Sequence, residues 1–571
     1  MLSVVVIFSG LASVLQIKVT ASFLDLAIFA AGSGQVPAGL YRQLLFIVLL
    51  VAYSWMSWST ISLLSARAKM KIRQKLRPVI IGKCAKLDYQ YIEDSASWDL
   101  ISRVTEKPEQ QVLDGHFALS MLLSIMINTI GVFAYIASAS WWAVPLILCF
   151  TVPLIVYSIK SGRANYEVNR EVSQIERKYS YLREVLLDRD YVDERTMFGY
   201  SKQINEDAYI EYGKANKIKI RAAVNWYIKT KIGGIFNVIS CLIVILILLE
   251  PVLAGDISVG LFIAVISGVF DLNYALSWGV SGNVDTLFKT GEFTKDIEQL
   301  MTMKETPDAV ADPVHMPEIK SIEFSNVSFC YPNTNTYILK DLSFKLEQGK
   351  HYAFVGANGA GKTTAVKLLT GLYRDYSGKI LVNDRDIRSY SEQELKGIFA
   401  IVYQDFARYS FSVRENCAIG DIVSFNDPKM VGRVERAVSM VELSSTVEAL
   451  LQGLDTPLGK IHSDGVDLSG GEWQKLAMAR ALTNRAPVRI LDEPTAALDP
   501  ITESRVYELF GRMSEDKLTI FISHRLGSTK IADEIFVFDD GAIKEQGNFD
   551  SLMSLNGLYK EMFEQQRSWY Q

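Results

Sequence analysis

Two segments in the second half of the chain carry residues that could bind phosphate groups. The first, Gly356-Ala-Asn-Gly-Ala-Gly-Lys-Thr-Thr364, directly follows the short apolar run His351–Val355. In such a strand-to-helix setting, glycines let backbone N–H groups close around phosphate oxygens, Lys362 neutralises charge on the β- and γ-phosphates, and the Thr363 hydroxyl binds Mg²⁺. We therefore predict a site for a nucleoside triphosphate and Mg²⁺. Its predicted contacts are Gly356, Asn358, Gly359, Gly361, Lys362, Thr363 and Thr364.

The second segment, Leu468-Ser-Gly-Gly-Glu-Trp-Gln474, contains a glycine turn that opens the predicted helix Trp473–Leu482. Free N–H groups at a helix start attract anions. The chain thus carries two helix starts that could bind phosphate. The predicted contacts of the second are Ser469, Gly470 and Gly471.

Adjacent carboxylates, Asp492 and Glu493, end a predicted strand that begins at Val488. In a phosphate-loop ATPase the first carboxylate holds Mg²⁺ and the second polarises the attacking water. A surface Asp-Glu pair is the alternative, and it would be preferred if the phosphate loop were absent. We therefore predict that Asp492 is a Mg²⁺ ligand and that Glu493 is the general base.

These residues lie in a domain that begins near Ile319. The preceding residues, 301–318, lack apolar runs and contain three prolines among mixed charges, which indicates a linker. Beyond it, Ile322–Phe329 alternates like a strand. We predict an α/β phosphate-loop ATPase domain over residues 319–571.

The composition indicates that the first half of the chain lies in a membrane. Hydrophobic residues make up 49% of the 571 residues and the mean hydropathy is +0.14, although the second half has an ordinary charged composition. The first half must therefore be more apolar than a soluble domain. A net charge of −5 does not favour a nucleic-acid partner. The five cysteines are widely spaced, which indicates reduced thiols.

Residues 1–300 contain apolar runs that predict an α-helical membrane domain of six transmembrane helices. Several runs are shorter than the ~20 residues needed to cross the hydrocarbon, so flanking residues must contribute. A cleaved signal peptide is the alternative for residues 1–17, but no positive charge precedes Lys18. The runs are Leu2–Ile17, Leu44–Leu64, Phe117–Ala137, Trp141–Ser158, Ile232–Leu249 and Ile257–Phe270, the last resuming after Asp271 as far as Val284.

The loops between these runs differ in charge. The loops over about 67–111 and 160–231 are long and rich in Lys and Arg, whereas 138–140 and 250–256 contain neither. The positive-inside rule therefore places the long loops, both termini and the ATPase domain in the cytoplasm of a multi-pass membrane protein. We expect the long loops to continue the membrane helices well into the cytoplasm.

Three ionisable residues lie inside predicted spans, and such residues usually face a bundle interior or an aqueous cavity. Lys18 and Asp25 could line a transport pathway, or they could snorkel at the outer end of the first span. Asp271 shares a predicted helical face with Tyr274 and Trp278, which could offer a carboxylate and two rings to a cationic, partly apolar chain. The alternative is that this face packs against a neighbouring helix and Asp271 is paired internally.

With these motifs in place, the chain resembles the half-exporters of the ATP-binding cassette (ABC) family, in which six membrane helices precede one cassette. Six cassette motifs occur in the family's order, and the resemblance implies ATP and Mg²⁺ as cofactors. It also implies that Tyr331 stacks on adenine and that Gln404 contacts both Mg²⁺ and the membrane domain. The Leu468–Gly471 stretch corresponds to the family's signature, Asp499 to its D-loop residue, and His524 to a histidine that contacts the γ-phosphate.

The resemblance further implies a dimer, because in this family the helix start at Ser469 completes the ATP site of the opposite copy. We expect a second copy of this chain, with a heterodimer as the alternative. Short helices at Tyr91–Trp98 and Asp193–Phe198 are expected to fit grooves on the cassettes. The chain departs from the family pattern at Glu472, at Lys460-Ile-His462 and at Arg489.

The function implied is ATP-driven export of an amphipathic substrate across the bacterial inner membrane by alternating access. The stretches Leu87–Ser95 and Tyr403–Asn416 resemble bacterial exporters of lantibiotics and related modified peptides. A modified peptide is therefore the expected cargo, and no peptidase domain is expected before the spans. Lipid flipping and multidrug efflux are the alternatives, and a non-pumping ABC channel or regulatory subunit is a third.

Overall fold

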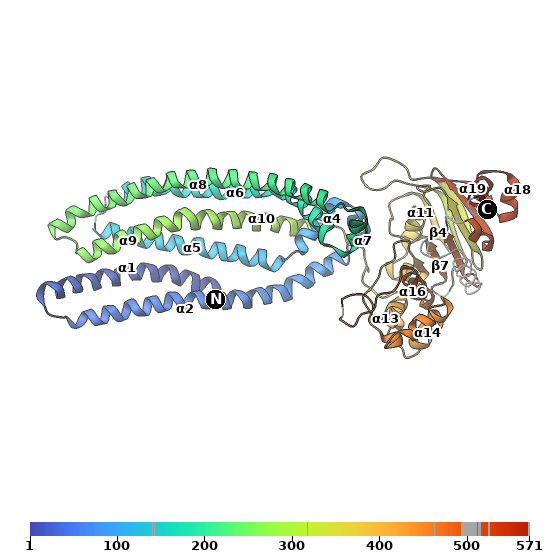
Figure 1. The fold of residues 1–571 in the computed structure, drawn as a ribbon, viewed down its shortest axis with the longest axis horizontal. Coiled ribbons are helices and arrows are strands. Elements are labelled where there is room, and N and C mark those ends of the chain that lie inside the picture. The colour runs from blue at the N-terminus through green and yellow to red at the C-terminus, as the bar shows by residue number, and fades with distance from the viewer. Residues whose placement is uncertain are drawn as a thin grey trace. The chain divides into compact units, whose positions relative to one another are not determined.

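The computed structural model describes residues 1–139, 141, 143–316, 318–461, 463–492, 511, 516–523 and 526–568. The chain divides into two compact units, which are treated separately (Figure 1). The helical unit comprises Met1–Gly82 and Leu100–Thr302. The α/β unit comprises Lys83–Asp99 and Met303–Gln571. Part of the first predicted cytoplasmic loop therefore folds with the α/β unit.

Long helices form the helical unit, and the predicted apolar runs fall on them. Among the described residues, Leu2–Ser33, Ala38–Cys84 and Pro108–Ser138 are long and apolar enough to cross a membrane, and Cys241–Ala254 and Val259–Leu272 are shorter apolar helices. A total of six spans stays a prediction. The helices are α1 (Leu2–Ser33), α2 (Ala38–Cys84), α5 (Pro108–Ala139), α6 (Ala143–Leu187), α8 (Ser201–Ala254), α9 (Val259–Tyr274) and α10 (Val280–Thr302), with a π-helical turn, η2 (Ala275–Gly279), between the last two.

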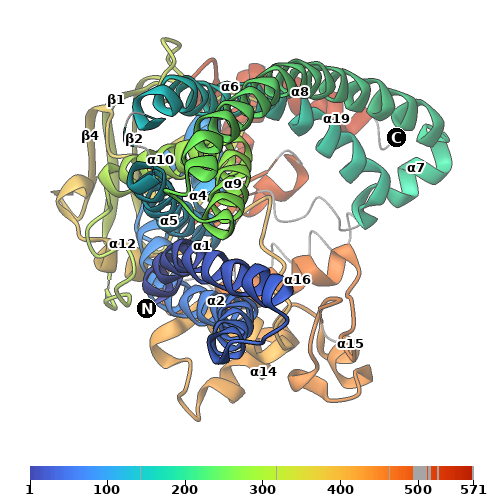
Figure 2. The same ribbon diagram turned by 90° about the vertical axis from the view of Figure 1, so that its left-hand side faces the viewer.

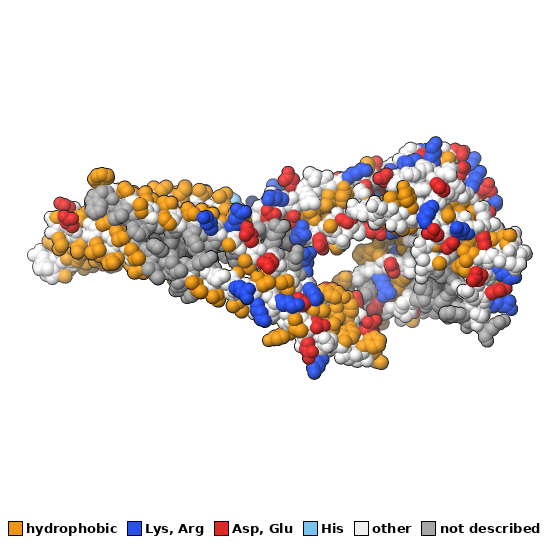
Figure 3. Space-filling model, turned by 90° about the horizontal axis from the view of Figure 1, so that it is seen from above, with side chains coloured by type: hydrophobic (Ala, Val, Ile, Leu, Met, Phe, Trp, Pro, Cys, Tyr) orange, Lys and Arg blue, Asp and Glu red, His pale blue; other side chains and the backbone are white. Residues whose placement is uncertain are grey.

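Within this unit, α5, α9 and α10 lie between the α1–α2 pair and the α6–α8 pair (Figure 2). Buried apolar side chains such as Ile136, Leu248 and Leu272 form the core between these helices. Many large apolar side chains remain exposed, among them Leu49 and Trp55 on α2. Figure 3 shows hydrophobic side chains spread over the helices. Exposed apolar surface of this kind is expected where helices face lipid.

Asp25 has a structural role in this unit. Its Oδ1 accepts a hydrogen bond of 2.7 Å from the backbone N–H of Gly260, in the first turn of α9. At the same helix start, the Ser258 hydroxyl accepts a bond of 3.1 Å from the Leu261 N–H. Asp25 therefore caps a helix from a neighbouring one, which satisfies an N–H group that the helix itself leaves free. Lys18 is exposed.

The predicted face of the last span is interrupted. Asp271 and Tyr274 lie on α9 and are both exposed, Tyr274 to 72%. Trp278, whose side chain lies outside the described residues, belongs to the π-helical turn η2. Because a π-helical turn contains more residues than an α-helical one, the α-helical spacing used to align Trp278 with Asp271 does not hold. Asp271 and Tyr274 are the members of the predicted face whose side chains are described.

Short helices form the tips of the two long loops. The Tyr91–Trp98 stretch contains the end of α3 (Tyr89–Glu93) and the start of α4 (Ser95–Thr105), whereas Asp193–Phe198 lies on α7 (Val192–Phe198), after the 3₁₀ turn η1 (Arg189–Tyr191). On α7, Met197 and Phe198 are 82% and 75% exposed. Docking of α7 on a cassette stays a prediction.

In the α/β unit, the chain just before α3 pairs with the segment that enters the cassette. Leu87 and Glu305 form an antiparallel β-bridge. On either side, the Thr306 N–H donates to Lys86 O at 2.8 Å and the Asp88 N–H donates to Lys304 O at 3.2 Å. The buried Lys83 ammonium donates to Glu305 Oε1 at 2.9 Å. This short paired segment, residues 83–88 with 303–306, anchors the start of the linker.

Two sheets form the rest of the α/β unit. The first has the strand order β2-β1-β4-β5, and the predicted alternating strand forms β1. The second has the order β10-β9-β3-β8-β7-β6, and β3, β6, β7, β8 and β9 run parallel in it. The strands are β1 (Ser321–Phe329), β2 (Leu339–Glu347), β3 (His351–Gly356), β4 (Ser377–Val382), β5 (Arg385–Asp386), β6 (Phe399–Val402), β7 (Val488–Asp492), β8 (Leu518–Ile522), β9 (Glu534–Asp539) and β10 (Ala542–Gly547).

Helices pack around these sheets. One core gathers strand residues such as Phe324, Phe354 and Phe536, and a second core, around Val434 and Trp473, joins helices that follow β6. The described helices are α11 (Lys362–Leu369), α12 (Glu392–Ile398), α13 (Val413–Ala418), α14 (Met430–Met440), α15 (Ser444–Ala449), α16 (Gly470–Thr483), α18 (Phe549–Leu555) and α19 (Leu558–Ser568), with 3₁₀ turns η3 (Ile387–Ser389), η4 (Ile419–Ser424), η5 (Gly453–Asp455) and η6 (Leu526–Ile531).

Candidate functional site

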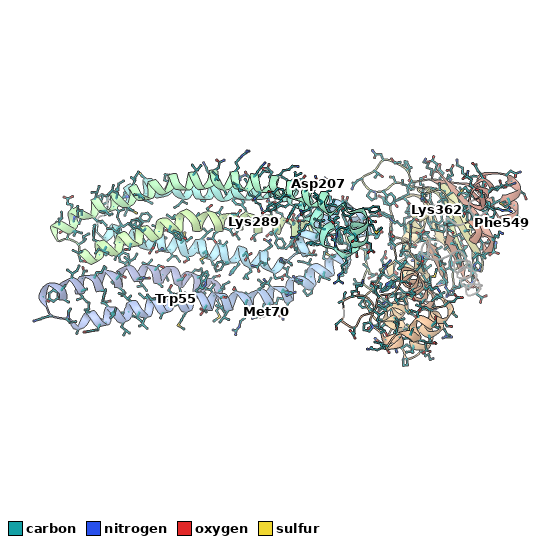
Figure 4. All side chains as sticks on the ribbon, viewed as in Figure 1. Trp55, Met70, Asp207, Lys289, Lys362 and Phe549 are labelled. Carbon is teal, nitrogen blue, oxygen red and sulfur yellow. The ribbon has the colours of Figure 1, made fainter. Side chains whose placement is uncertain are left out.

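The predicted phosphate loop joins β3 to α11 in the expected setting. Gly356 has a φ of 144°, and a Cβ there would lie 2.2 Å from Phe538 O, so only glycine fits. Gly361 caps α11 at a φ of 101°. The Lys362 ammonium, labelled in Figure 4, donates to the carbonyl oxygens of Gly356 and Ala357 at 2.8 and 3.0 Å. The loop therefore holds its cation against its own backbone, where a phosphate group could replace the carbonyl contacts.

Two of the predicted Mg²⁺ ligands, Thr363 and Asp492, come together at one edge of the second sheet. Asp492 ends β7 with 1% of its surface exposed, and its Oδ1 accepts a 3.5 Å hydrogen bond from the Thr363 hydroxyl on α11. Gln404 follows β6, the strand paired with β7, and is exposed. Carboxylate, hydroxyl and amide oxygens are hard ligands that suit Mg²⁺. The residues present therefore fit a Mg²⁺ ion.

Three predicted residues of this site, Glu493, Asp499 and His524, lie outside the described residues. Glu493 directly follows the buried Asp492 in the sequence, and His524 comes soon after β8, which lies beside β7. Their roles as general base, D-loop residue and γ-phosphate contact stay predictions.

Tyr331, the residue expected to stack on adenine, is tied to the phosphate loop. Its hydroxyl is 3.0 Å from Thr364 Oγ1 in the first turn of α11. Its ring meets the edge of Tyr373 at 5.5 Å between centroids and an interplanar angle of 84°. Of the other predicted loop contacts, Asn358 and Gly359 are exposed. The structure thus brings Tyr331 to the helix that follows the phosphate loop, and its stacking on adenine stays a prediction.

The second predicted phosphate site, at the start of α16, has a complete capping box. The Ser469 hydroxyl and backbone N–H donate to Glu472 Oε2 at 2.7 and 2.8 Å, and the Glu472 N–H donates to Ser469 Oγ at 3.3 Å. Thr446 donates to the other oxygen, Glu472 Oε1, at 2.9 Å. These hydrogen bonds hold the pKa of Glu472 below its usual value, and the bond from the Ser469 N–H has the largest effect.

This arrangement gives the departure at Glu472 a physical reason, since Glu is favoured at the third position of a capping box. Among the described residues, the hydrogen bonds of Ser469 stay within this helix start, and none joins Ser469, Gly470 or Gly471 to the phosphate loop. Within the described part of one copy, the two predicted phosphate sites are therefore not joined by hydrogen bonds.

The other two departures are partly described. Lys460 forms an ion pair of 3.4 Å with Asp467, and His462 lies outside the described residues. Arg489 is buried on β7, and burial lowers its pKa to about 10. Burial and the nearby Arg489 charge lower the pKa of Lys517 to about 8.

Sequence reasoning missed two residues beside the predicted adenine contact, Lys367 and Tyr373. Lys367 Nζ lies 5.5 Å from the centroid of the Tyr331 ring. Lys367 comes one helical turn after Thr363, so the helix periodicity could have placed it beside the site. No sequence signal pointed to Tyr373, which follows α11 in a loop and is buried.

Comparison with known proteins identifies the same kind of domain. Residues 339–496 match the family described as ABC transporter. This range includes the phosphate loop, the Ser469 helix start and Asp492. Nucleotide binding by the α/β unit follows from this match.

Relatives match along most of the chain. The chain is 29% identical over 511 residues to the subtilin transport ATP-binding protein SpaT of Bacillus subtilis, covering 88% of this chain and 81% of that protein. It is 27% identical over 514 residues to the nisin transport ATP-binding protein NisT of Lactococcus lactis subsp. lactis, covering 88% and 83%. It is also 27% identical over 544 residues to the ATP-dependent lipid A-core flippase of Pseudomonas aeruginosa, covering 91% and 84%.

The fold is also found in a solved structure of a bacterial Atm1-family ABC exporter with ATP bound. The TM-score is 0.69 at 24% identity, and the match covers 99% of this chain and 97% of the other. The predicted fold class, a helical membrane domain followed by an α/β ATPase cassette, is confirmed by this likeness.

Proposed function

Because residues 339–496 form an ABC transporter ATP-binding domain in a membrane chain with the fold of an ABC exporter, we propose that this protein couples ATP hydrolysis to export of an amphipathic peptide. The observation that carries the proposal is the contact between Thr363 and Asp492 beside the glycine-lined phosphate loop. A single chain thus contains apolar helices and the oxygen ligands of a nucleotide site.

The proposal divides the roles at this site among described and undescribed residues. Lys362 and the loop N–H groups bind the phosphates, and Tyr331 stacks on adenine. Thr363, Asp492 and Gln404 would hold Mg²⁺, which neutralises charge on the β- and γ-phosphates. Glu493 orients and deprotonates the attacking water, while His524 and Asp499 complete the γ-phosphate side.

The working unit in this proposal is a homodimer, because each chain supplies one phosphate loop and one signature helix. The start of α16 carries the Ser469 N-cap, whose N–H groups suit a phosphate of the second copy's ATP. A heterodimer is the alternative. The long Lys- and Arg-rich loops favour a cytoplasmic ATPase domain, with both termini on the same side of the bacterial inner membrane.

The proposed cargo is a modified peptide. Two relatives carry the names of transporters of subtilin and nisin, which fits the local resemblance to lantibiotic exporters. On α9, the exposed Asp271 and Tyr274 offer a carboxylate and a ring to a cationic peptide. Lipid flipping is the second candidate, since another relative is a lipid A-core flippase. Multidrug efflux and a non-pumping channel or regulator are the remaining alternatives.

Purified full-length protein in liposomes tests this proposal. We expect a cationic lanthionine peptide such as nisin to stimulate ATP hydrolysis and to enter inside-out vesicles only with ATP. Asp271→Asn should weaken peptide stimulation, whereas Asp256→Asn, in a loop outside this face, should not. If lipid A or amphipathic drugs stimulate ATP hydrolysis and no peptide does, the cargo is a lipid or a drug and not a peptide. Peptide movement without hydrolysis would indicate a channel.

A further inference from the structure

The side of the nucleotide site that faces adenine contains a carboxylate from a distant part of the chain. Glu93, at the end of α3, accepts a hydrogen bond of 2.6 Å from the Lys367 ammonium on α11. Its second oxygen accepts a hydrogen bond from the Tyr373 hydroxyl. One carboxylate therefore holds two side chains of the cassette, and all three residues belong to the α/β unit.

Both side chains held by Glu93 contact Tyr331. The Tyr373 ring meets the Tyr331 ring edge-on, and Lys367 Nζ lies 5.5 Å from the centroid of the Tyr331 ring. The Lys367 ammonium is also 5.7 Å from the ring of Tyr89, which itself packs edge-on against Tyr373. These contacts form a cluster in which Glu93 is the negative partner.

The charges in this cluster are partly removed from water. The Lys367 side chain is 17% exposed, the Glu93 side chain is 39% exposed, and Tyr373 is buried. Loss of the Glu93 charge would leave a mostly buried ammonium without its anionic partner and a buried hydroxyl with a weaker acceptor. The contacts of Lys367 and Tyr373 with the Tyr331 ring would then loosen, while those of Tyr331 with Phe329 and Thr364 would remain.

We propose that Glu93 is a positioning residue for the nucleotide base: through Lys367 and Tyr373 it fixes the ring of Tyr331 on which adenine stacks. The inference rests on the proposed function, because it assumes that Tyr331 contacts the base. By thermodynamic linkage, base binding at Tyr331 and docking of the segment around α3 favour each other. Binding of the base therefore favours docking of this part of the first cytoplasmic loop. The contact lies apart from the Mg²⁺ ligands.

The test compares ATP with inorganic tripolyphosphate, which lacks a base, in the full-length protein. Glu93→Gln should raise the KM for ATP about threefold or more, as expected for loss of a charged hydrogen bond. It should leave the inhibition constant of tripolyphosphate unchanged. The matched control is Asp94→Asn, which removes one charge from the next residue. Asp94 bonds Ser97 within its own segment, at 2.8 Å to the N–H and 2.7 Å to the hydroxyl, so its variant should keep the KM.

A double-mutant cycle connects the effect to Tyr331. Tyr331→Ala should raise the KM for ATP, and adding Glu93→Gln to it should raise the KM no further. Thermal unfolding of each variant reports whether the fold is retained, and Lys367→Met provides a second variant with the same expected base-specific effect.

The outcomes separate the inference from the proposed function. If Tyr331→Ala raises the KM for ATP but neither Glu93→Gln nor Lys367→Met does, Glu93 has no positioning role and the nucleotide site stands. An equal rise in the tripolyphosphate constant would show general damage and overturn base-specific positioning. If Tyr331→Ala leaves the KM unchanged, the adenine assignment fails and the inference fails with it.

Discussion

The Thr363 hydroxyl lies 3.5 Å from Asp492 Oδ1, although 129 positions separate the two residues in the chain. The contact exists because β3, which leads into the phosphate loop, and β7 both end at the same edge of a parallel sheet. Ligands bind at this edge in open α/β sheets, and here it gathers oxygen atoms beside a lysine. This relationship makes the Mg²⁺ dependence of ATP hydrolysis a direct test of the site.

Thr363→Val should raise the Mg²⁺ concentration needed for half-maximal ATP hydrolysis by about tenfold, because a ligand is lost while the shape is kept. Thr363→Ser retains the hydroxyl and is the matched control. The measurement is phosphate release against Mg²⁺ concentration at fixed ATP. Equal Mg²⁺ curves for the valine variant and the wild type would remove Thr363 from the Mg²⁺ site.

Glu493→Gln should abolish turnover and spare ATP binding, since it leaves the phosphate loop and Tyr331 intact. A positioned general base contributes roughly 10²- to 10⁴-fold to a rate. Phosphate release and binding of labelled ATP, measured on the same preparation, separate the two effects. Hydrolysis near the wild-type rate would show that another group activates the water.

Mixed dimers test whether two copies share each ATP site. Chains with Lys362→Ala and chains with Ser469→Arg should each be inactive. Together they should regain partial hydrolysis, because a mixed dimer contains one site with both an intact phosphate loop and an intact signature helix. Two affinity tags allow mixed dimers to be purified. Stable mixed dimers without any hydrolysis would contradict shared sites.

Glu472→Gln should lower the KM for ATP by about two- to fivefold, which corresponds to the usual effect of one charge at a helix start. Glutamine can keep the capping box, while the negative charge beside the predicted phosphate contact of Ser469 is lost. Glu415→Gln, in the capping box of α13, is the matched control. A higher KM in the Glu472 variant would indicate that its carboxylate helps to order the site.

Stability should rise with pH above about pH 8 because of Lys517. Burial and the charge of Arg489 lower the pKa of Lys517 to about 8, whereas an unfolded lysine titrates near ~10.4. Between these values the unfolded chain binds a proton that the folded chain has lost, so the folded state gains stability as pH increases. Thermal unfolding at pH 7 and pH 9.5 should show a smaller increase for Lys517→Gln than for wild type. Lys544→Gln, at an exposed position on β10, should behave as wild type.

The sequence predicted the structure best where the signal lies in neighbouring residues. The phosphate loop was predictable because glycines, lysine and threonine recur at fixed spacing between a strand and a helix, and Gly356 and Gly361 have the conformations that this requires. Apolar runs likewise predicted helices, and α1 contains Lys18 and Asp25, the two ionisable residues assigned to the first span. The apolar run alone does not show where this helix ends, because α1 continues past the exposed Lys18 and past Asp25, whose carboxylate caps α9.

What could not be predicted depends on contacts between distant residues. Glu93 and Lys367 are 274 positions apart, and each alone is an ordinary charged residue on a helix. The π-helical turn at Ala275–Gly279 could not be predicted either, because it leaves no mark in the apolar pattern. The capping box of Ser469 and Glu472 is a local pattern, but the bond from Thr446, on another helix, to the same carboxylate could not be predicted from the sequence.

The pairing of residues 83–88 with 303–306 has a practical consequence for anyone who wishes to study the cassette alone. A fragment that starts at Met303 includes the predicted linker and the predicted domain of residues 319–571, but it omits Lys83–Asp99, which fold with the cassette. Such a fragment would leave Glu305 without Lys83, and Tyr373 without Glu93. The truncated cassette would therefore expose a normally covered aromatic surface, and adding residues 83–99 as a separate peptide should improve its solubility.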